Sequence, residues 1–260
     1  MSLVNVSKNM GIASFELDAP PANTYSYEMM RELDTAIVDA RMDDDVHVIV
    51  LTGAGDKFFC AGADIAMLHE AKPGFKYYFC LHANETLSRF EHTSKLVIAA
   101  LNGHTVGGGL EVALAADLRI AKKDGGKIGL PEVNLGVLPG TGGTQRLARQ
   151  LGRSRALELM VTGKLLSFDE AHALGLVNEV FDAESFRDQV MAYAAQFVPP
   201  AKASKAVGHI KRAVCSGLEV PFSGGLALER ELQQQLFLSN DAKEGIAAHL
   251  EKRKPDFKGN

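Results

Sequence analysis

Two glutamates lie in surroundings where a carboxylate is unexpected. Glu111 follows the glycine run 107–109, and residues 112–116 after it are all apolar, so its helix is expected to be buried on every side. A buried carboxylate is costly unless it has a partner or takes up a proton. The helix dipole also favours a glutamate near a helix N-terminus, and this simpler reason for Glu111 stays open.

The second glutamate, Glu132, lies in the apolar loop 128–140, which is punctuated by glycine and proline. Long ordered loops of this kind often carry function, although Glu132 taken alone fits a scaffold equally well. If both glutamates share one apolar pocket, each raises the tendency of the other to hold a proton. The pair would then supply one acid and one base near neutral pH.

Unpaired backbone N–H groups are the second candidate chemistry. The segment 58–64, FFCAGAD, follows the strand-like run VHVIVLTG, and the glycines 107–109 open an apolar helix. The first N–H groups of a helix lack partners and point toward its positive end. Free donors are therefore expected near Ala63 and near Gly108, although a plain strand-to-helix turn would also explain the first segment.

Several common site types are excluded. The sequence has no Gly-x-Ser-x-Gly elbow, no Gly-Lys-Ser/Thr phosphate loop and no His-x-x-x-His pair. The three cysteines, Cys60, Cys80 and Cys215, are far apart and odd in number, which fits neither a disulfide framework nor a zinc site. The glycines at 140–143 lack the spacing and the preceding strand of a dinucleotide loop. We therefore expect no metal and no cofactor.

Composition limits the partners. The 28 basic and 32 acidic residues give a net charge of −4, which argues against nucleic acid as the main partner. No apolar run approaches the roughly 18 residues of a membrane-spanning helix, and residues 1–9 carry no signal-like pattern. A cytoplasmic protein with no membrane partner is the expectation.

The elements that must position these groups follow from hydrophobic patterning. Strands are expected at 11–17, 46–52, 96–101, 117–121 and 176–181, with amphipathic helices between them, for example at 75–92 and 144–151. A capping box at 167–170 opens a short helix that Gly175 closes. After Pro199-Pro200 only helices are expected, at 201–216, 221–238 and 241–251. Periodicity alone suggests an α/β core at 1–195 with a doubly wound sheet, then a helical subdomain at 196–260.

Taken together, the sequence blocks resemble the enoyl-CoA hydratase/isomerase (crotonase) superfamily. The matching blocks are FFCAGADI, NGHTVGGGLEVALAADLRIA and GLPEVNLGVLPGTGGTQRLARQLG, and the likeness continues through ALELMVTGKLLSFDEAHALGLVNEV and AAHLEKRKPDFK. The resemblance implies an α/β fold built as a spiral of ββα units, with a helical C-terminal subdomain for trimerisation. It also implies a homo-oligomer, either a trimer or a dimer of trimers.

The resemblance further implies roles for individual residues. The substrate would be an acyl-CoA thioester, whose oxygen the N–H groups of Ala63 and Gly108 would bind. Glu111 would orient and deprotonate water and Glu132 would protonate Cα, which gives syn hydration of an enoyl-CoA. The matching substrate and coenzyme A contacts fall on Ala22, Ala61, Asp64, Ile65, Ala66, Leu68, Leu138 and Gly140.

Two alternatives remain open at this point. One is an enoyl-CoA isomerase or another thioester-enolate reaction on the same scaffold, and the other is a non-catalytic relative, such as one that binds RNA. Tyr25 also departs from the family pattern, which commonly has a small aliphatic residue there. The basic tail, Lys252, Arg253, Lys254 and Lys258, is either a solvated helix end or an aid to binding the coenzyme A phosphates.

Overall fold

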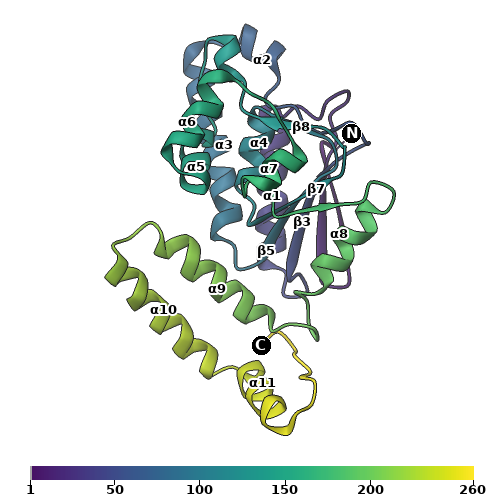
Figure 1. The fold of residues 1–260 in the computed structure, drawn as a ribbon, viewed down its shortest axis with the longest axis vertical. Helices are drawn as coiled ribbons and strands as arrows, with labels where there is room; N and C mark the ends of the chain where they lie inside the picture. The colour runs from purple at the N-terminus through teal and green to yellow at the C-terminus, as the bar shows by residue number, and fades with distance from the viewer. Residues whose placement is uncertain (1) are drawn as a thin grey trace.

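The computed structural model describes residues 2–260 and contains two β-sheets (Figure 1). The larger sheet has six strands in the order β1 (Val4–Asn9), β2 (Ile12–Leu17), β3 (Val48–Gly53), β5 (Leu96–Leu101), β7 (Leu118–Lys122) and β10 (Glu179–Phe181). The smaller sheet has four strands in the order β4 (Phe58–Cys60), β6 (His104–Val106), β8 (Lys127–Gly129) and β9 (Leu166–Ser167). Within the described part of the chain, only the β1–β2 and β8–β9 strand pairs are antiparallel.

The chain winds through these sheets in repeated turns. In each turn one strand enters the large sheet, the next enters the small sheet, and helical structure follows: β3 and β4 precede α2 (Ile65–Glu70) and α3 (Pro73–His92), and β5 and β6 precede α4 (Gly108–Leu114). β7 and β8 precede the 3-10 helix η1 (Glu132–Leu135) and α5 (Gly143–Leu151). This is the ββα spiral implied by the resemblance. The doubly wound sheet suggested by periodicity is therefore wrong, because every second strand leaves the main sheet.

The large sheet is buried on both faces. On β3, Ile49 and Leu51 pack in the cluster that also holds α1 (Tyr27–Met42), α3 and α4. Val48 and Val50 alternate with them and face α8 (Phe186–Ala195) on the other side. The period-two alternation of a strand divides its residues between these two apolar layers. α1, α3 and α4 therefore share one side of the sheet.

The last helices form a layer below the α/β body in Figure 1. They are α9 (Ser204–Gly217), α10 (Phe222–Phe237) and α11 (Asn240–Glu251), each within three residues of its predicted bounds. Lys211 on α9 anchors this layer, because its ammonium pairs with Asp117 at 2.7 Å and donates to the carbonyl of Phe90 at 2.6 Å. The division predicted between residues 195 and 196 falls at the end of α8, and no helix or strand follows before Ser204.

Some predicted bounds differ from the structure. The strand expected at 176–181 is only Glu179–Phe181, because Leu176 and Val177 close the end of α7 (Phe168–Ala173) by donating to the carbonyl of Ala171. No strand is predicted at β1, because five of its six residues are exposed and an edge strand of this kind lacks a clear apolar pattern. α6 (Arg153–Thr162) completes the elements. Among residues 2–260, no helix combines the length and apolarity needed to span a membrane.

Candidate active site

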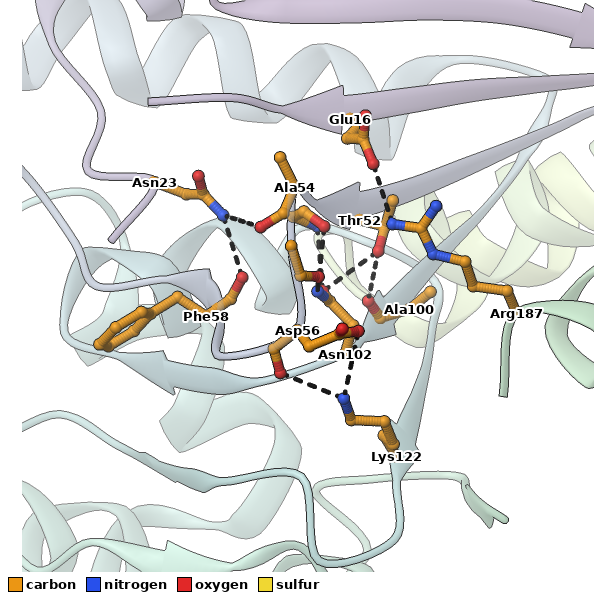
Figure 2. A network of polar contacts seen from close by, with 12 residues as sticks. Glu16, Asn23, Thr52, Ala54, Asp56, Phe58, Ala100, Asn102, Lys122 and Arg187 are labelled. Atoms are coloured by element: carbon orange, nitrogen blue, oxygen red, sulfur yellow. Dashed lines mark hydrogen bonds and ion pairs between the residues drawn. The ribbon is translucent and has the colours of Figure 1, made fainter. Parts of the chain in front are cut away.

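A buried polar network fixes the loops from which the small-sheet strands start (Figure 2). The side-chain amide of Asn102, just after β5, accepts from the N–H of Gly53 at 3.0 Å and donates to its carbonyl at 2.9 Å. The Asn23 amide nitrogen donates to the carbonyls of Ala54 and Phe58, at 3.0 Å each. Each side-chain amide satisfies buried backbone groups of a neighbouring segment. These hydrogen bonds therefore hold the ends of β3 and β5 and the start of β4 in fixed positions relative to one another.

The segment after β4 leaves the N–H of Ala63 unpaired. Tyr25 forms a parallel bridge with Ala63, in which the N–H of Tyr25 donates to Gly62 at 2.9 Å and the carbonyl of Tyr25 accepts from Asp64 at 3.0 Å. That bridge uses both backbone groups of Tyr25 and neither group of Ala63. Among residues 2–260 the Ala63 N–H donates no hydrogen bond.

The start of α4 supplies a second free donor beside the first. Gly107 adopts φ +58°, and Gly108 is the first helical residue, so its N–H has no partner within the helix. A Cβ on Gly62 would lie 3.0 Å from the nitrogen of Gly108, which places the Ala61–Asp64 turn against this N–H. A Cβ on Gly109 would lie only 1.9 Å from the carbonyl oxygen of Cys60. The bare glycines therefore let α4 approach the end of β4 closely.

Glu111 is held within the core one turn along α4. The residue is 2% exposed, and its Oε1 accepts from the N–H groups of Thr141 and Gly143, both at 2.7 Å. Burial raises the pKa of Glu111, while these two N–H groups, the Thr141 hydroxyl and the charge of Arg146 lower it. The two N–H groups fix the direction of the carboxylate and favour its charged form.

Glu132 lacks such partners. Both carboxylate oxygens are buried, and neither accepts a hydrogen bond from another residue among residues 2–260. Burial raises the pKa of Glu132 to about 7, and the nearby charge of Glu111 adds to the effect. A Cβ on Gly107 would lie 3.1 Å from Oε1 of Glu132, so this carboxyl lies beside the first turn of α4.

The structure thus brings the two glutamates and the two free N–H groups to one place. Glu111 and Gly108 lie on the same short helix, and Glu132 reaches that helix from η1. The Glu111 carboxyl is oriented by two N–H groups that favour its charged form, although burial raises its pKa overall, and the pKa of Glu132 is about 7. Such a pair is suited to supply a base and an acid. Two N–H groups together are suited to a developing oxyanion.

The remaining predicted contact residues occupy different surroundings. Ala61 donates its N–H to the carbonyl of Ala22 at 3.0 Å, so these two lie together at the site. The Asp64 carboxylate caps α2 by accepting from the N–H groups of Ala66 and Met67, at 2.9 and 3.2 Å. Leu68 packs against the core, whereas Ile65 and Ala66 are exposed.

The other end of the predicted contact set is more open. Leu138 is 66% exposed, and the Gly140 carbonyl accepts from the Asn84 side chain at 3.4 Å. A Cβ on Gly140 would lie 3.4 Å from Sγ of Cys80. In the basic tail, Arg253 pairs with Glu244 at 2.6 Å.

Sequence reasoning missed three residues of the site. Thr141 contributes an N–H to Glu111, and Arg146 supports that loop by donating to the Thr141 carbonyl at 3.2 Å. Arg146 is itself paired with Glu91 at 2.7 Å. Tyr25 departed from the family pattern in sequence, but nothing there indicated that its hydroxyl would meet Thr141, 116 residues away. Among residues 2–260, no cluster of three His, Cys, Asp or Glu side chains is arranged to hold a metal.

Comparisons with known proteins show the family of the chain. Residues 7–260 match the enoyl-CoA hydratase/isomerase family model. A probable enoyl-CoA hydratase of Bacillus subtilis (strain 168) is 38% identical over 261 residues, covering 100% of both chains. A short-chain-enoyl-CoA hydratase of Clostridium acetobutylicum is 37% identical over 257 residues, covering 98% of this chain and 97% of that protein.

A solved structure shares the whole fold. The crystal structure of an enoyl-CoA hydratase from Geobacillus kaustophilus HTA426 has a TM-score of 0.97 and 48% identity, covering 100% of this chain and 98% of that one. The repeated ββα turns and the C-terminal helices are therefore a known fold. The chain belongs to the enoyl-CoA hydratase/isomerase (crotonase) family, within its enoyl-CoA hydratase branch.

Proposed function

We propose that this enzyme adds water syn across the α,β double bond of an enoyl-CoA thioester. The observation that carries the proposal is the meeting of two buried carboxyls, Glu111 and Glu132, with the free N–H groups of Ala63 and Gly108. The Clostridium acetobutylicum relative is named for a short-chain enoyl-CoA, so crotonyl-CoA is the first substrate to test.

The two N–H groups would bind the thioester oxygen. When water attacks Cβ, electrons move onto this oxygen and an enolate develops. Donors already fixed by the Tyr25 bridge and by the start of α4 need no reorganisation to stabilise that charge. Each such hydrogen bond can lower the barrier by about 3 kcal/mol.

The carboxyls would divide the proton transfers. Glu111, charged and oriented by two N–H groups, accepts a proton from water as the water oxygen bonds to Cβ. Glu132, whose pKa is about 7, donates its proton to Cα as the enolate collapses. The proton on Glu111 then passes to Glu132 through the next water, which restores the starting state. Because both carboxyls act from one side, the hydrogen and the hydroxyl add to the same face.

The remaining parts of the proposal concern the assembly. No cofactor is needed, because coenzyme A is part of the substrate. A trimer or a dimer of trimers is supported by exposed apolar side chains on the C-terminal helices or directly after them, namely Ile210, Val214, Leu218, Phe222, Phe237, Leu238, Ile246 and Leu250. Native mass spectrometry would test this assembly. The cytoplasmic location stays a prediction of the sequence.

Loss of the conjugated-thioester absorbance of crotonyl-CoA tests the reaction. The wild type should consume the substrate, and Glu111→Gln and Glu132→Gln should each slow turnover by about 100-fold or more while the far-UV spectrum is kept. Exchange of the double-bond position without water uptake would instead identify an isomerase. Retention of RNA with no activity on any enoyl thioester would indicate the non-catalytic alternative.

A further inference from the structure

Tyr25 touches both halves of the site. Its backbone forms the bridge that leaves the Ala63 N–H free. Its side chain is 2% exposed, and its hydroxyl lies 3.0 Å from Oγ1 of Thr141. A Cβ on Gly108 would lie 2.2 Å from the same hydroxyl, so the phenol oxygen lies against the α-carbon of the second oxyanion donor.

Thr141 connects this hydroxyl to Glu111. The Thr141 N–H donates to Oε1 of Glu111 at 2.7 Å, and the Thr141 hydroxyl also lowers the pKa of that carboxyl. Burial raises the pKa of Tyr25 well above its usual range, and the Glu111 charge adds to this, so the phenol keeps its proton and can donate it. When Tyr25 donates to Oγ1, the Thr141 proton is free to point toward the carboxylate.

We infer that Tyr25 is a positioning residue for Glu111, acting through the hydroxyl of Thr141. The Tyr25 hydroxyl meets the Thr141 hydroxyl, and the Thr141 N–H donates to Oε1 of Glu111, so Tyr25 and Thr141 together form a donor chain toward the proposed base. The effect on catalysis rests on the proposed hydratase function, whereas the effect on Glu111 itself does not.

Tyr25→Phe tests the hydroxyl without removing the ring. The ring packs on Phe79 with centroids 5.9 Å apart, and phenylalanine keeps this contact. Loss of the hydroxyl should lower kcat for crotonyl-CoA about tenfold and change KM less than twofold. The acidic limb of the kcat/KM profile should move to higher pH, because the Glu111 carboxylate loses stabilisation.

Other ionisable groups also face Glu111. They are Glu132 from η1, Arg146 from α5 and Cys80 from α3. None of them is altered in Tyr25→Phe, so a shift of the profile reports on the donor chain. The pKa of Glu111 can also be read without substrate, from the carboxyl carbon of ¹³C-labelled glutamate, with Glu111→Gln to assign the signal. That pKa should rise in Tyr25→Phe.

Three further variants separate positioning from packing. Tyr193→Phe removes a hydroxyl from α8, where the ring packs on Phe181, and should leave activity and profile unchanged. Thr141→Val should reproduce the loss, and adding Tyr25→Phe to it should cause no further loss. Thr141→Ser, which keeps the hydroxyl, should retain most of the activity.

The outcomes are distinct. If the wild type does not hydrate enoyl thioesters, the proposed function fails, and the ¹³C titration alone decides whether Tyr25 acts on Glu111. If the wild type is active but Tyr25→Phe matches it in kcat, profile and ¹³C titration, the inference is overturned. Additive losses in the double variant would also overturn it. If Tyr25→Phe does not fold, Thr141→Val and Thr141→Ser are compared instead. Equal activity of these two variants would show that the Thr141 hydroxyl has no role, and the inference would be overturned.

Discussion

Replacing Glu132 by glutamine should make the folded protein more stable in alkaline solution while removing its activity. Both carboxylate oxygens of Glu132 are buried, with no hydrogen bond from another residue among residues 2–260. Charging this group in the folded protein is therefore costly. Glutamine has nearly the same shape and carries no charge at any pH, so the pH-dependent part of the stability difference isolates the cost of the charge.

The size of the effect follows from the pKa difference. Burial raises the pKa of Glu132 from 4.5 to about 7. Between these values the folded protein holds a proton that the unfolded chain has lost, so wild-type stability falls as the pH rises through this window. At 1.36 kcal/mol per pH unit the full loss is about 3.4 kcal/mol. Because the residue as a whole is half-buried, solvent reduces this to about 2 kcal/mol.

Urea unfolding followed by circular dichroism, from pH 5 to pH 8, measures the effect. The protein concentration must be equal throughout, since association adds to apparent stability. Relative to wild type, Glu132→Gln should gain about 1 kcal/mol or slightly more across this range, since part of the loss in wild-type stability lies below pH 5. Glu85→Gln changes an exposed residue on α3, so its free energy of unfolding should differ from that of wild type by the same amount at every pH. The reasoning would be refuted if the stability of Glu132→Gln relative to wild type stayed constant or fell as the pH rises.

The remaining predictions concern the packing that positions the site. Gly109→Ala should destabilise the protein by about 3 kcal/mol or more, because the new Cβ would lie 1.9 Å from the Cys60 carbonyl; Gly74→Ala, with open space around it, should change Tm by little. Lys211→Met should cost about 3–5 kcal/mol in urea unfolding, because it leaves the Asp117 carboxylate buried without its partner. An unchanged midpoint for either Gly109→Ala or Lys211→Met would contradict the packing described above.

The central strands of the large sheet could be predicted from local pattern, whereas its edge strand β1 and the strands of the small sheet could not. Residues 96–101 are an apolar run, and the structure places β5 at Leu96–Leu101. By contrast, β4, β6 and β8 have three residues each and β9 has two, which is too short for any period to appear. Their pairing depends on turns fixed by Asn23 and Asn102, whose partners are distant in sequence.

The same division applies to the site. Glu111 could be predicted as a buried carboxylate because its apolar neighbours lie on one helix, and the free N–H at Gly108 follows from the glycines that open that helix. By contrast, the Thr141 N–H that holds Glu111 and the Tyr25 hydroxyl that contacts Thr141 come from segments far apart in the sequence, which only the fold brings together. Local sequence carries no signal of such contacts.

The face on which water adds tests the central claim most directly, namely that Glu111 and Glu132 act together on one water. Crotonyl-CoA would be hydrated in D₂O, and the relative configuration of deuterium at Cα and hydroxyl at Cβ would be read by proton NMR. Transfer from two carboxyls on one side predicts a single product, with deuterium and hydroxyl on the same face. A mixture of the two configurations, or addition to opposite faces, would contradict the account.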